Sequence, residues 1–209
     1  MQGQLLELVD AASLLFRFDM ENVPVGNRWP RIANEWMKYK DSHFTAFADT
    51  HIAFGLLFAE GNAGGDVVEE WLGEVGSRAV AEEEIESTRF PTWTSRGTAA
   101  VGRALCRAIV HFRKREYAEA VQLLYPLRTR IPDVGGSHAQ RDAFQQLLVQ
   151  CALRSDEPHH ALIARGLLNE RHAARPRSQL TARLMEKLER ALAEHAISSS
   201  RSDFLPVDY

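Results

Sequence analysis

The segment ALCRAIVHFRKREYAEAVQLL, residues 104–124, has the pattern of a helical hairpin. Apolar residues recur every three or four positions on both sides of a short charged turn at residues 114–116, and this spacing places them on one face of each helix. Because so short a connection keeps the two helices side by side, we expect them to run antiparallel and to pack against each other. The segment therefore predicts an all-α fold.

The same pattern returns in QQLLVQCALRSDEPHHALIAR, residues 145–165. Ala120 and Ala161 hold equivalent positions in the two hairpins, and small side chains there let paired helices approach closely. In the first hairpin Ala120 also follows Tyr117 by three positions, an arrangement typical of the second half of a tetratricopeptide unit. The repeat length and signature depart from the standard unit, so we expect degenerate units stacked as an α-α superhelix of antiparallel hairpins.

The remaining sequence divides into further helices and breaks. Apolar periodicity predicts helices near residues 4–19 and 42–60, and Pro126 is expected to disturb the second helix of the first hairpin because it lacks a backbone donor. The segment 81–97 begins acidic and ends in proline and glycine, which is typical of a loop. We expect one tetratricopeptide-like domain over residues 1–196, with a point of subdivision at this loop, and a flexible tail over 197–209.

Composition narrows the class of protein. The net charge of −3 over 209 residues argues against nucleic-acid binding, and no apolar run approaches the roughly 20 residues of a membrane span. The first residues lack the basic start of a signal peptide, and Cys106 and Cys151 fall in apolar helical patterns as expected of buried free thiols. These features favour a cytoplasmic protein. We find no phosphate-binding loop or metal-ligand spacing, so we expect no cofactor and no metal.

The segment GGSHAQRD, residues 135–142, concentrates polar side chains at a helix start. Ser137 and Gln140 have the spacing of a capping box, in which each side chain satisfies a backbone donor of the other residue. A second interpretation is anion capture by the helix N-terminus together with Arg141 and His138. A third is that Arg141 and Asp142 brace a neighbouring helix through a buried ion pair.

Asp49 and His51 offer another candidate site if their helix meets His138 and Asp142. Such a set would suit metal binding or general base chemistry. However, two residues two positions apart on a helix point about 200° away from each other. Since His51 also falls on a phenylalanine-rich face, we expect a hydrogen-bonded core histidine and not a catalytic one.

Five segments share their order and residues with a known family. They are DAASLLFR (10–17), VGNRW (25–29), FADTH (47–51), GGSHAQRD (135–142) and LLNER (167–171). On these segments the chain resembles the C-terminal half of the tetratricopeptide repeat protein 38 family. The resemblance implies an α-α superhelix and no settled activity. The chain departs from the family pattern in two ways: it has Ala48 where the pattern has Asn, and it lacks a segment matching the family's N-terminal half.

We expect the protein to have a non-catalytic function. The first hypothesis is a scaffold that binds a protein or peptide partner in a helical groove. The alternative is a protein or enzyme that binds a small anionic ligand near Asp49, His51, His138 and Arg141. Plausible groove-lining residues are Tyr39, Phe44, Tyr117, Arg141 and Asp142.

Self-association is a further expectation, because a truncated superhelix exposes an apolar end. The first helix is apolar on more than one side, so we expect a homodimer through that end. The residues concerned are Leu5, Leu6, Leu8, Leu14 and Phe18. Near the other end, the region containing Arg171, Arg175, Arg177 and Arg183 is locally basic, as expected of a solvated face or a surface that docks an acidic partner.

Overall fold

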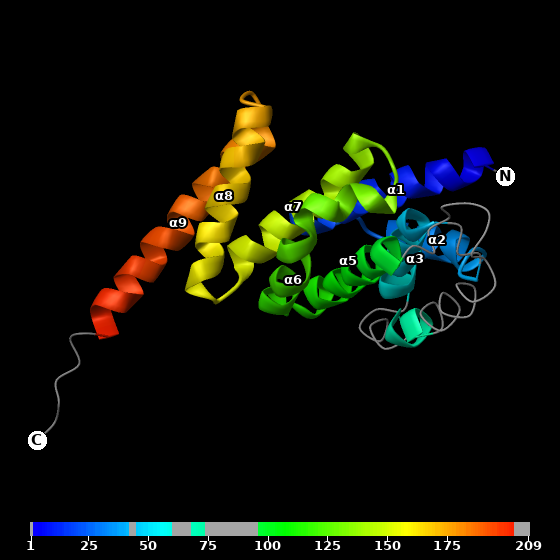
Figure 1. The fold of residues 1–209 in the computed structure, drawn as a ribbon, viewed down its shortest axis with the longest axis horizontal. Helices are drawn as coiled ribbons and strands as arrows, with labels where there is room; N and C mark the ends of the chain where they lie inside the picture. The colour runs from blue at the N-terminus through cyan, green and yellow to red at the C-terminus, as the bar shows by residue number, and fades with distance from the viewer. Residues whose placement is uncertain (1, 42–44, 60–67, 74–95, 203–209) are drawn as a thin grey trace, which may run out of the picture. The chain divides into compact units, whose positions relative to one another are not determined.

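The computed structural model describes residues 2–41, 45–59, 68–73 and 96–202 (Figure 1). These residues form helices and short connections, with no strand among them, which confirms the all-α prediction. Residues 68–73 form a short helical segment. The other α-helices are α1 (Gln2–Met20), α2 (Arg28–Met37), α3 (Ala46–Ala59), α5 (Arg96–Lys114), α6 (Tyr117–Leu124), α7 (His138–Arg154), α8 (Pro158–Ala174) and α9 (Gln179–Ser202).

The hairpin predicted from residues 104–124 is formed by α5 and α6, which pack against each other (Figure 1). The turn is closed by Arg115, which adopts a left-handed φ of 63°. Ala120 is fully buried. As expected from Pro126, α6 ends at Leu124, and the chain continues as a 3₁₀ helix (Tyr125–Val134).

The chain forms two compact units, residues 1–148 and 149–209. The boundary falls inside α7 and not at the loop 81–97, where the sequence offered a point of subdivision. Most of that loop lies outside the described residues. A helix can join two units because its residues need not all pack in the same core. Apolar periodicity continues unchanged along such a helix, so the sequence pattern does not indicate where one unit ends.

The C-terminal helix is longer than the sequence suggested. We expected a flexible tail from residue 197, but α9 continues to Ser202. No Gly or Pro lies between residues 179 and 202, so nothing in the local sequence stops the helix where the serines begin. Residues 203–209 lie outside the described range.

The core of the first unit is built from aromatic rings. Phe54 of α3 lies 4.3 Å from the Phe16 ring of α1 and 6.5 Å from the Phe144 ring of α7, measured between ring centroids. Trp29 of α2 stacks on Phe58 of α3 at 4.1 Å. These rings come from α1, α2, α3 and the start of α7, so they hold together segments that are distant in sequence.

The core of the second unit contains smaller side chains. Helices α8 and α9 pack against each other as an antiparallel pair (Figure 1), burying Ala164 and Leu168 of α8 with Leu184 and Leu188 of α9. No helix in the described parts of the chain is long and apolar enough to cross a membrane.

Candidate functional site

The start of α7 has the predicted capping box. The Ser137 backbone N–H donates to Gln140 Oε1 at 2.8 Å, and the Gln140 N–H donates to Ser137 Oγ at 3.3 Å. The two side chains therefore satisfy donors that an anion would otherwise bind.

The glycines before the box are required by backbone conformation and by close packing. Gly135 and Gly136 have φ angles of 92° and 76°, which other residues rarely adopt. A Cβ on Gly136 would lie 2.6 Å from the Phe47 ring of α3. This turn is thus pressed directly against α3, and the sequence alone did not indicate that contact.

Arg141 folds back on the same turn. Its Nη1 donates to the backbone oxygen of Gly135 at 3.2 Å and to that of Gly136, and its Nη2 lies 3.4 Å from His138 Nδ1. The guanidinium thus donates hydrogen bonds to two carbonyl groups of a tight turn. Of the three interpretations from sequence, this arrangement fits a structural role best.

The beginning of α7 is clasped by α1. Gln140 Nε2 donates to Asp10 Oδ1 at 3.3 Å, and Arg17 Nη2 donates to the Ala139 oxygen at 2.7 Å. Arg17 Nη1 also donates to the Ser13 oxygen at 3.1 Å on its own helix. We call these contacts of Asp10, Arg17, Ala139 and Gln140 the α1–α7 clasp. Together with Phe47, they bring three of the five family-like segments into one place.

Asp142 is half-buried and accepts a hydrogen bond from Gln146 Nε2 at 2.6 Å. Gln146 is itself buried, and sequence reasoning missed it. Its position four residues after Asp142 on α7 was the available signal, because side chains at that spacing meet on a helix.

His51 is a core histidine, as its place on the phenylalanine-rich face predicted. It is fully buried, and its Nδ1 lies 2.7 Å from the Phe47 oxygen. The rings of Phe47, Phe54 and Phe144 lie 4.5, 5.4 and 6.0 Å away, and Nε2 has no hydrogen-bond partner among the described residues. Burial is the main cause that lowers the pKa of His51 to about 4, so the ring is neutral at physiological pH.

Asp49 occupies a different environment on the same helix. It is buried, and desolvation raises its pKa to about 8, so the carboxyl is mostly protonated at neutral pH. Burial, and then the proximity of Asp49, raise the pKa of the Cys106 thiol on α5. His138, in contrast, is exposed at the start of α7. The candidate residues therefore lie in separate surroundings, and no group of three or more potential metal ligands occurs in the described residues.

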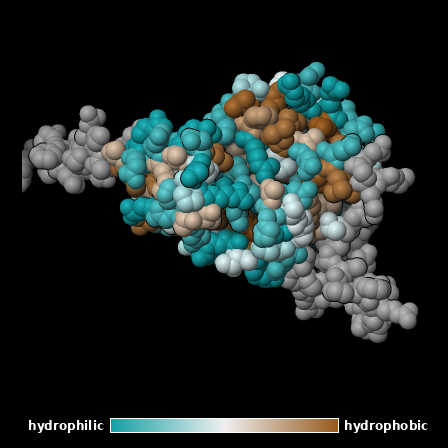
Figure 2. Space-filling model, turned by 90° about the horizontal axis from the view of Figure 1, so that it is seen from above, coloured by the Kyte–Doolittle hydropathy of each residue, from teal (hydrophilic) through white to brown (hydrophobic). Residues whose placement is uncertain are grey.

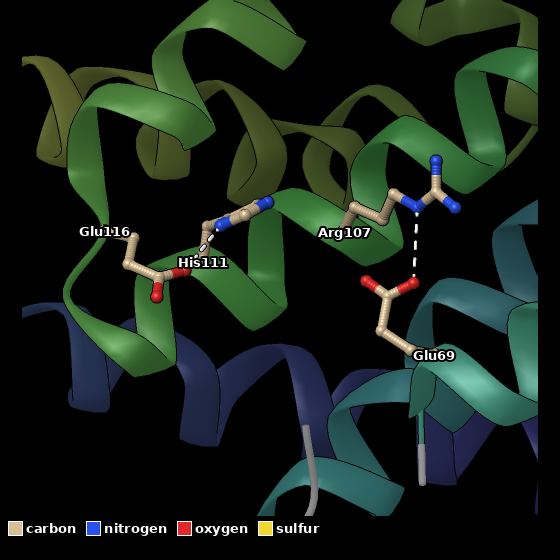
Figure 3. Close-up of polar contacts among 4 residues, drawn as sticks. All are labelled: Glu69, Arg107, His111 and Glu116. Carbon is tan, nitrogen blue, oxygen red and sulfur yellow. Dashed lines mark hydrogen bonds and ion pairs between the residues drawn. The ribbon is translucent and has the colours of Figure 1, made fainter. Parts of the chain in front are cut away.

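The polar contacts of α5 are a separate feature (Figure 3). Arg107 Nε lies 3.4 Å from Glu69 Oε2, and His111 Nδ1, one turn further along, lies 2.7 Å from Glu116 Oε2. These side chains are partly or largely exposed, so each pair contributes at most about 1 kcal/mol. They fasten α5 to residues 68–73 and to the start of α6.

The first unit also exposes apolar side chains. Figure 2 shows hydrophobic residues gathered in a patch among hydrophilic ones. Leu6, Leu14 and Phe18 of α1 are exposed, followed by Val23 after the helix. We call Leu6, Leu14 and Phe18 the α1 strip, because they fall within about 120° around the helix axis.

The two tyrosines that were expected to line a groove are only partly accessible to a partner. Tyr39 and Tyr117 are half-buried and pack edge-on against Trp36 and Phe112, at centroid distances of 6.3 and 5.8 Å. Phe44 lies outside the described residues.

Comparisons with known proteins assign the chain to no family or fold. No protein-family model matches the chain. No solved structure matches it either.

Proposed function

We propose that this chain is a non-catalytic interaction module that binds a protein or peptide partner through the α1 strip. The observation that carries the proposal is the exposure of Leu6, Leu14 and Phe18 on a helix whose opposite face is buried in an aromatic core. Exposed apolar side chains on one face of a well-packed scaffold are typical of protein-interaction surfaces. We further propose that the helices stack as a tetratricopeptide-like superhelix related to the protein 38 family, in the cytoplasm.

The size of the α1 strip limits what it does alone. Each side chain has about half of its surface left to bury, which contributes about 1 kcal/mol. The three together provide about 3 kcal/mol, which corresponds to a dissociation constant weaker than about 1 mM. A specific partner must therefore bury more surface, as an amphipathic helix laid along α1 would.

A second copy of the chain is one such partner, and the homodimer is the form of the proposal that is simplest to test. Light scattering of the purified protein over a range of concentrations should show a mass above that of the monomer. The double variant Leu14→Ser/Phe18→Ser should be monomeric with an unchanged melting temperature, because both side chains are already exposed.

Leu162→Ser is the matched control, since Leu162 of α8 is 56% exposed and Leu14 is 52% exposed. If the wild type is monomeric, the homodimer is excluded, and the test moves to heterologous partners. Partners cross-linked to a photoreactive residue at position 14 should then be lost in the double variant and kept in the control. Equal loss in both variants, or no partner at all, would overturn the proposal.

The polar residues of the α7 start support this proposal over an anionic-ligand site. Arg141 is engaged by two turn carbonyls, and Gln140 is engaged by Ser137 and Asp10. The polar groups that an anionic ligand would need therefore already have hydrogen-bond partners within the protein.

A further inference from the structure

Charge in the second unit is segregated along the sequence. Residues 158–185 contain five arginines and a single acidic residue, Glu170, whereas the turn before them contains Asp156 and Glu157. The whole chain carries a net charge of −3. The cationic excess is therefore local to α8, its connection to α9, and the first turns of α9.

Five basic side chains in this region are exposed. Arg165 and His172 lie on α8, Arg175 and Arg177 lie in the connection to α9, and Arg183 lies on α9. We call these five residues, which extend from the middle of α8 to the first turns of α9, the basic hairpin end. The side chains of Arg165, Arg175 and Arg177 form no hydrogen bond or ion pair with the described residues.

Helix electrostatics accounts for only part of this arrangement. Cations in the last turn of a helix interact favourably with its C-terminal carbonyl groups, which explains His172 and the adjacent Arg171. The effect falls off within one turn, so it does not reach Arg165. Arg183 is near the N-terminal end of α9, where cations are unfavourable, and the first turn of α9 has no acidic residue. The helix termini therefore do not account for the positions of Arg165 and Arg183.

We propose that the basic hairpin end is a docking surface for an acidic, extended peptide segment of a partner protein. Charge complementarity identifies the occupant. Four of the five residues of the basic hairpin end are arginines, which are charged at every physiological pH, and the planar guanidinium binds carboxylates through two parallel hydrogen bonds. Because the surface is exposed and polar, it adds specificity and a fast association rate more than tight binding. This proposal uses no residue of the α1 strip, so it does not depend on the function proposed for that strip.

The composition of the unit favours a peptide over a nucleic acid. Residues 149–202, the part of this unit that the structure describes, contain no Phe, Tyr or Trp, the large rings that commonly stack on bases. The negative net charge of the chain also repels a long polyanion. A short acidic segment needs neither stacking nor an extended basic surface.

The test measures binding of a short fluorescein-labelled peptide of alternating Glu and Ser to the full chain by fluorescence anisotropy. Binding should be measurable at about 0.05 M salt and weaken at least about tenfold at 0.5 M salt, because exposed charges are screened. Arg175→Glu/Arg177→Glu should weaken binding by about tenfold or more, since attraction becomes repulsion. Arg175→Gln/Arg177→Gln should give a smaller loss.

The matched control is Arg31→Glu/Lys114→Glu, which makes the same change in net charge with two exposed residues of the first unit. This variant should bind the peptide within about twofold of the wild type. An equal loss in the control variant would show that only overall charge matters and would overturn the proposal. Tighter binding of a single-stranded oligonucleotide or of phosphatidylserine vesicles than of the peptide would overturn it too, as would absence of peptide binding at low salt.

Discussion

The two units of the chain use different side chains to hold their helices together. In the first unit, rings from α1, α2, α3 and the start of α7 pack around Phe54 in stacked or tilted arrangements. In the second unit, Ala164, Leu168, Leu184 and Leu188 fill a narrow helical pair without any aromatic ring. Large rings bury more apolar area for each residue, so the first unit should derive more of its stability from single core positions.

The polar groups differ in the same way. The first unit buries Asp49 and His51 in its core, whereas the second unit exposes most of its arginines. Buried polar groups make a structure depend on exact partners and on protonation state. The first unit is therefore expected to be sensitive to small changes and to pH, and the second to tolerate surface changes.

The largest expected effect is loss of a central ring. Phe54→Ala should destabilise the first unit by about 4 kcal/mol, and Leu184→Ala should destabilise the second by about 3 kcal/mol. All four tryptophans precede residue 149, so tryptophan fluorescence reports the first unit, while far-UV circular dichroism reports both. Phe54→Ala should move the fluorescence transition in urea more than Leu184→Ala does. Identical shifts by both probes in both variants would show that the units unfold together.

The next effect compares two glycines. Gly136→Ala places a Cβ at a positive φ and against the Phe47 ring, so it should destabilise the protein by about 2–4 kcal/mol. Gly166→Ala lies inside α8 with no atom within 4 Å of the new Cβ, and it should stabilise by about 0.5–1 kcal/mol. Urea unfolding of both variants measures the difference. A neutral Gly136→Ala would contradict the close packing of this turn on α3.

The pH dependence of the first unit's stability should be set by Asp49 and His51. The unfolded His51 binds a proton below about 6.5 while the folded ring stays neutral down to about 4, so stability falls as pH decreases over this range. The unfolded Asp49 ionises above 3.8 while the folded carboxyl stays protonated up to about 8, so stability falls as pH increases over that range. From about pH 4 to 6.5 the two effects cancel. From 6.5 to 8 only Asp49 acts, and about 2 kcal/mol should be lost.

Asp49→Asn separates the two groups, because residue 49 then no longer titrates. Stability of this variant should rise between about pH 4 and 6.5 and stay level from 6.5 to 8. The measurement is the free energy of unfolding in urea, followed by tryptophan fluorescence at each pH. Wild-type protein whose stability stays level up to pH 8 would sink the assignment of a protonated Asp49.

The smallest expected effect compares the helix caps of the two units. Ser137→Ala removes the acceptor for the Gln140 N–H, and Ser178→Ala removes the acceptor for the Thr181 N–H at 3.2 Å. Each should cost about 1 kcal/mol. Gln140→Ala should cost more than Ser137→Ala, because it also removes a contact of the α1–α7 clasp. Thermal unfolding of the three variants measures the order, and equal losses would show that the hydrogen bond between Gln140 and Asp10 contributes nothing to stability.

Local features of the candidate site could be predicted from the sequence. The capping box, the interruption at Pro126 and the core position of His51 each depend on neighbours within a few residues. The engagement of Arg141 by the two glycine carbonyls was not predicted, because its alternatives, an anion or Asp142, need the same side chain. The burial of Asp49 was also not predicted, because the sequence pattern of an apolar helix does not distinguish a buried acidic residue from an exposed one.

By itself, the sequence determined that the protein is helical, that residues 104–124 form a hairpin, and that its polar α7 start would be capped. Helical periodicity and caps are set by short-range backbone geometry, so they can be read from a few neighbouring residues. Only the tertiary structure decided the α1–α7 clasp, whose hydrogen bonds join residues 122 and 130 positions apart, and the division of α7 between two units. These depend on which distant faces pack together, and local patterns carry no record of that choice.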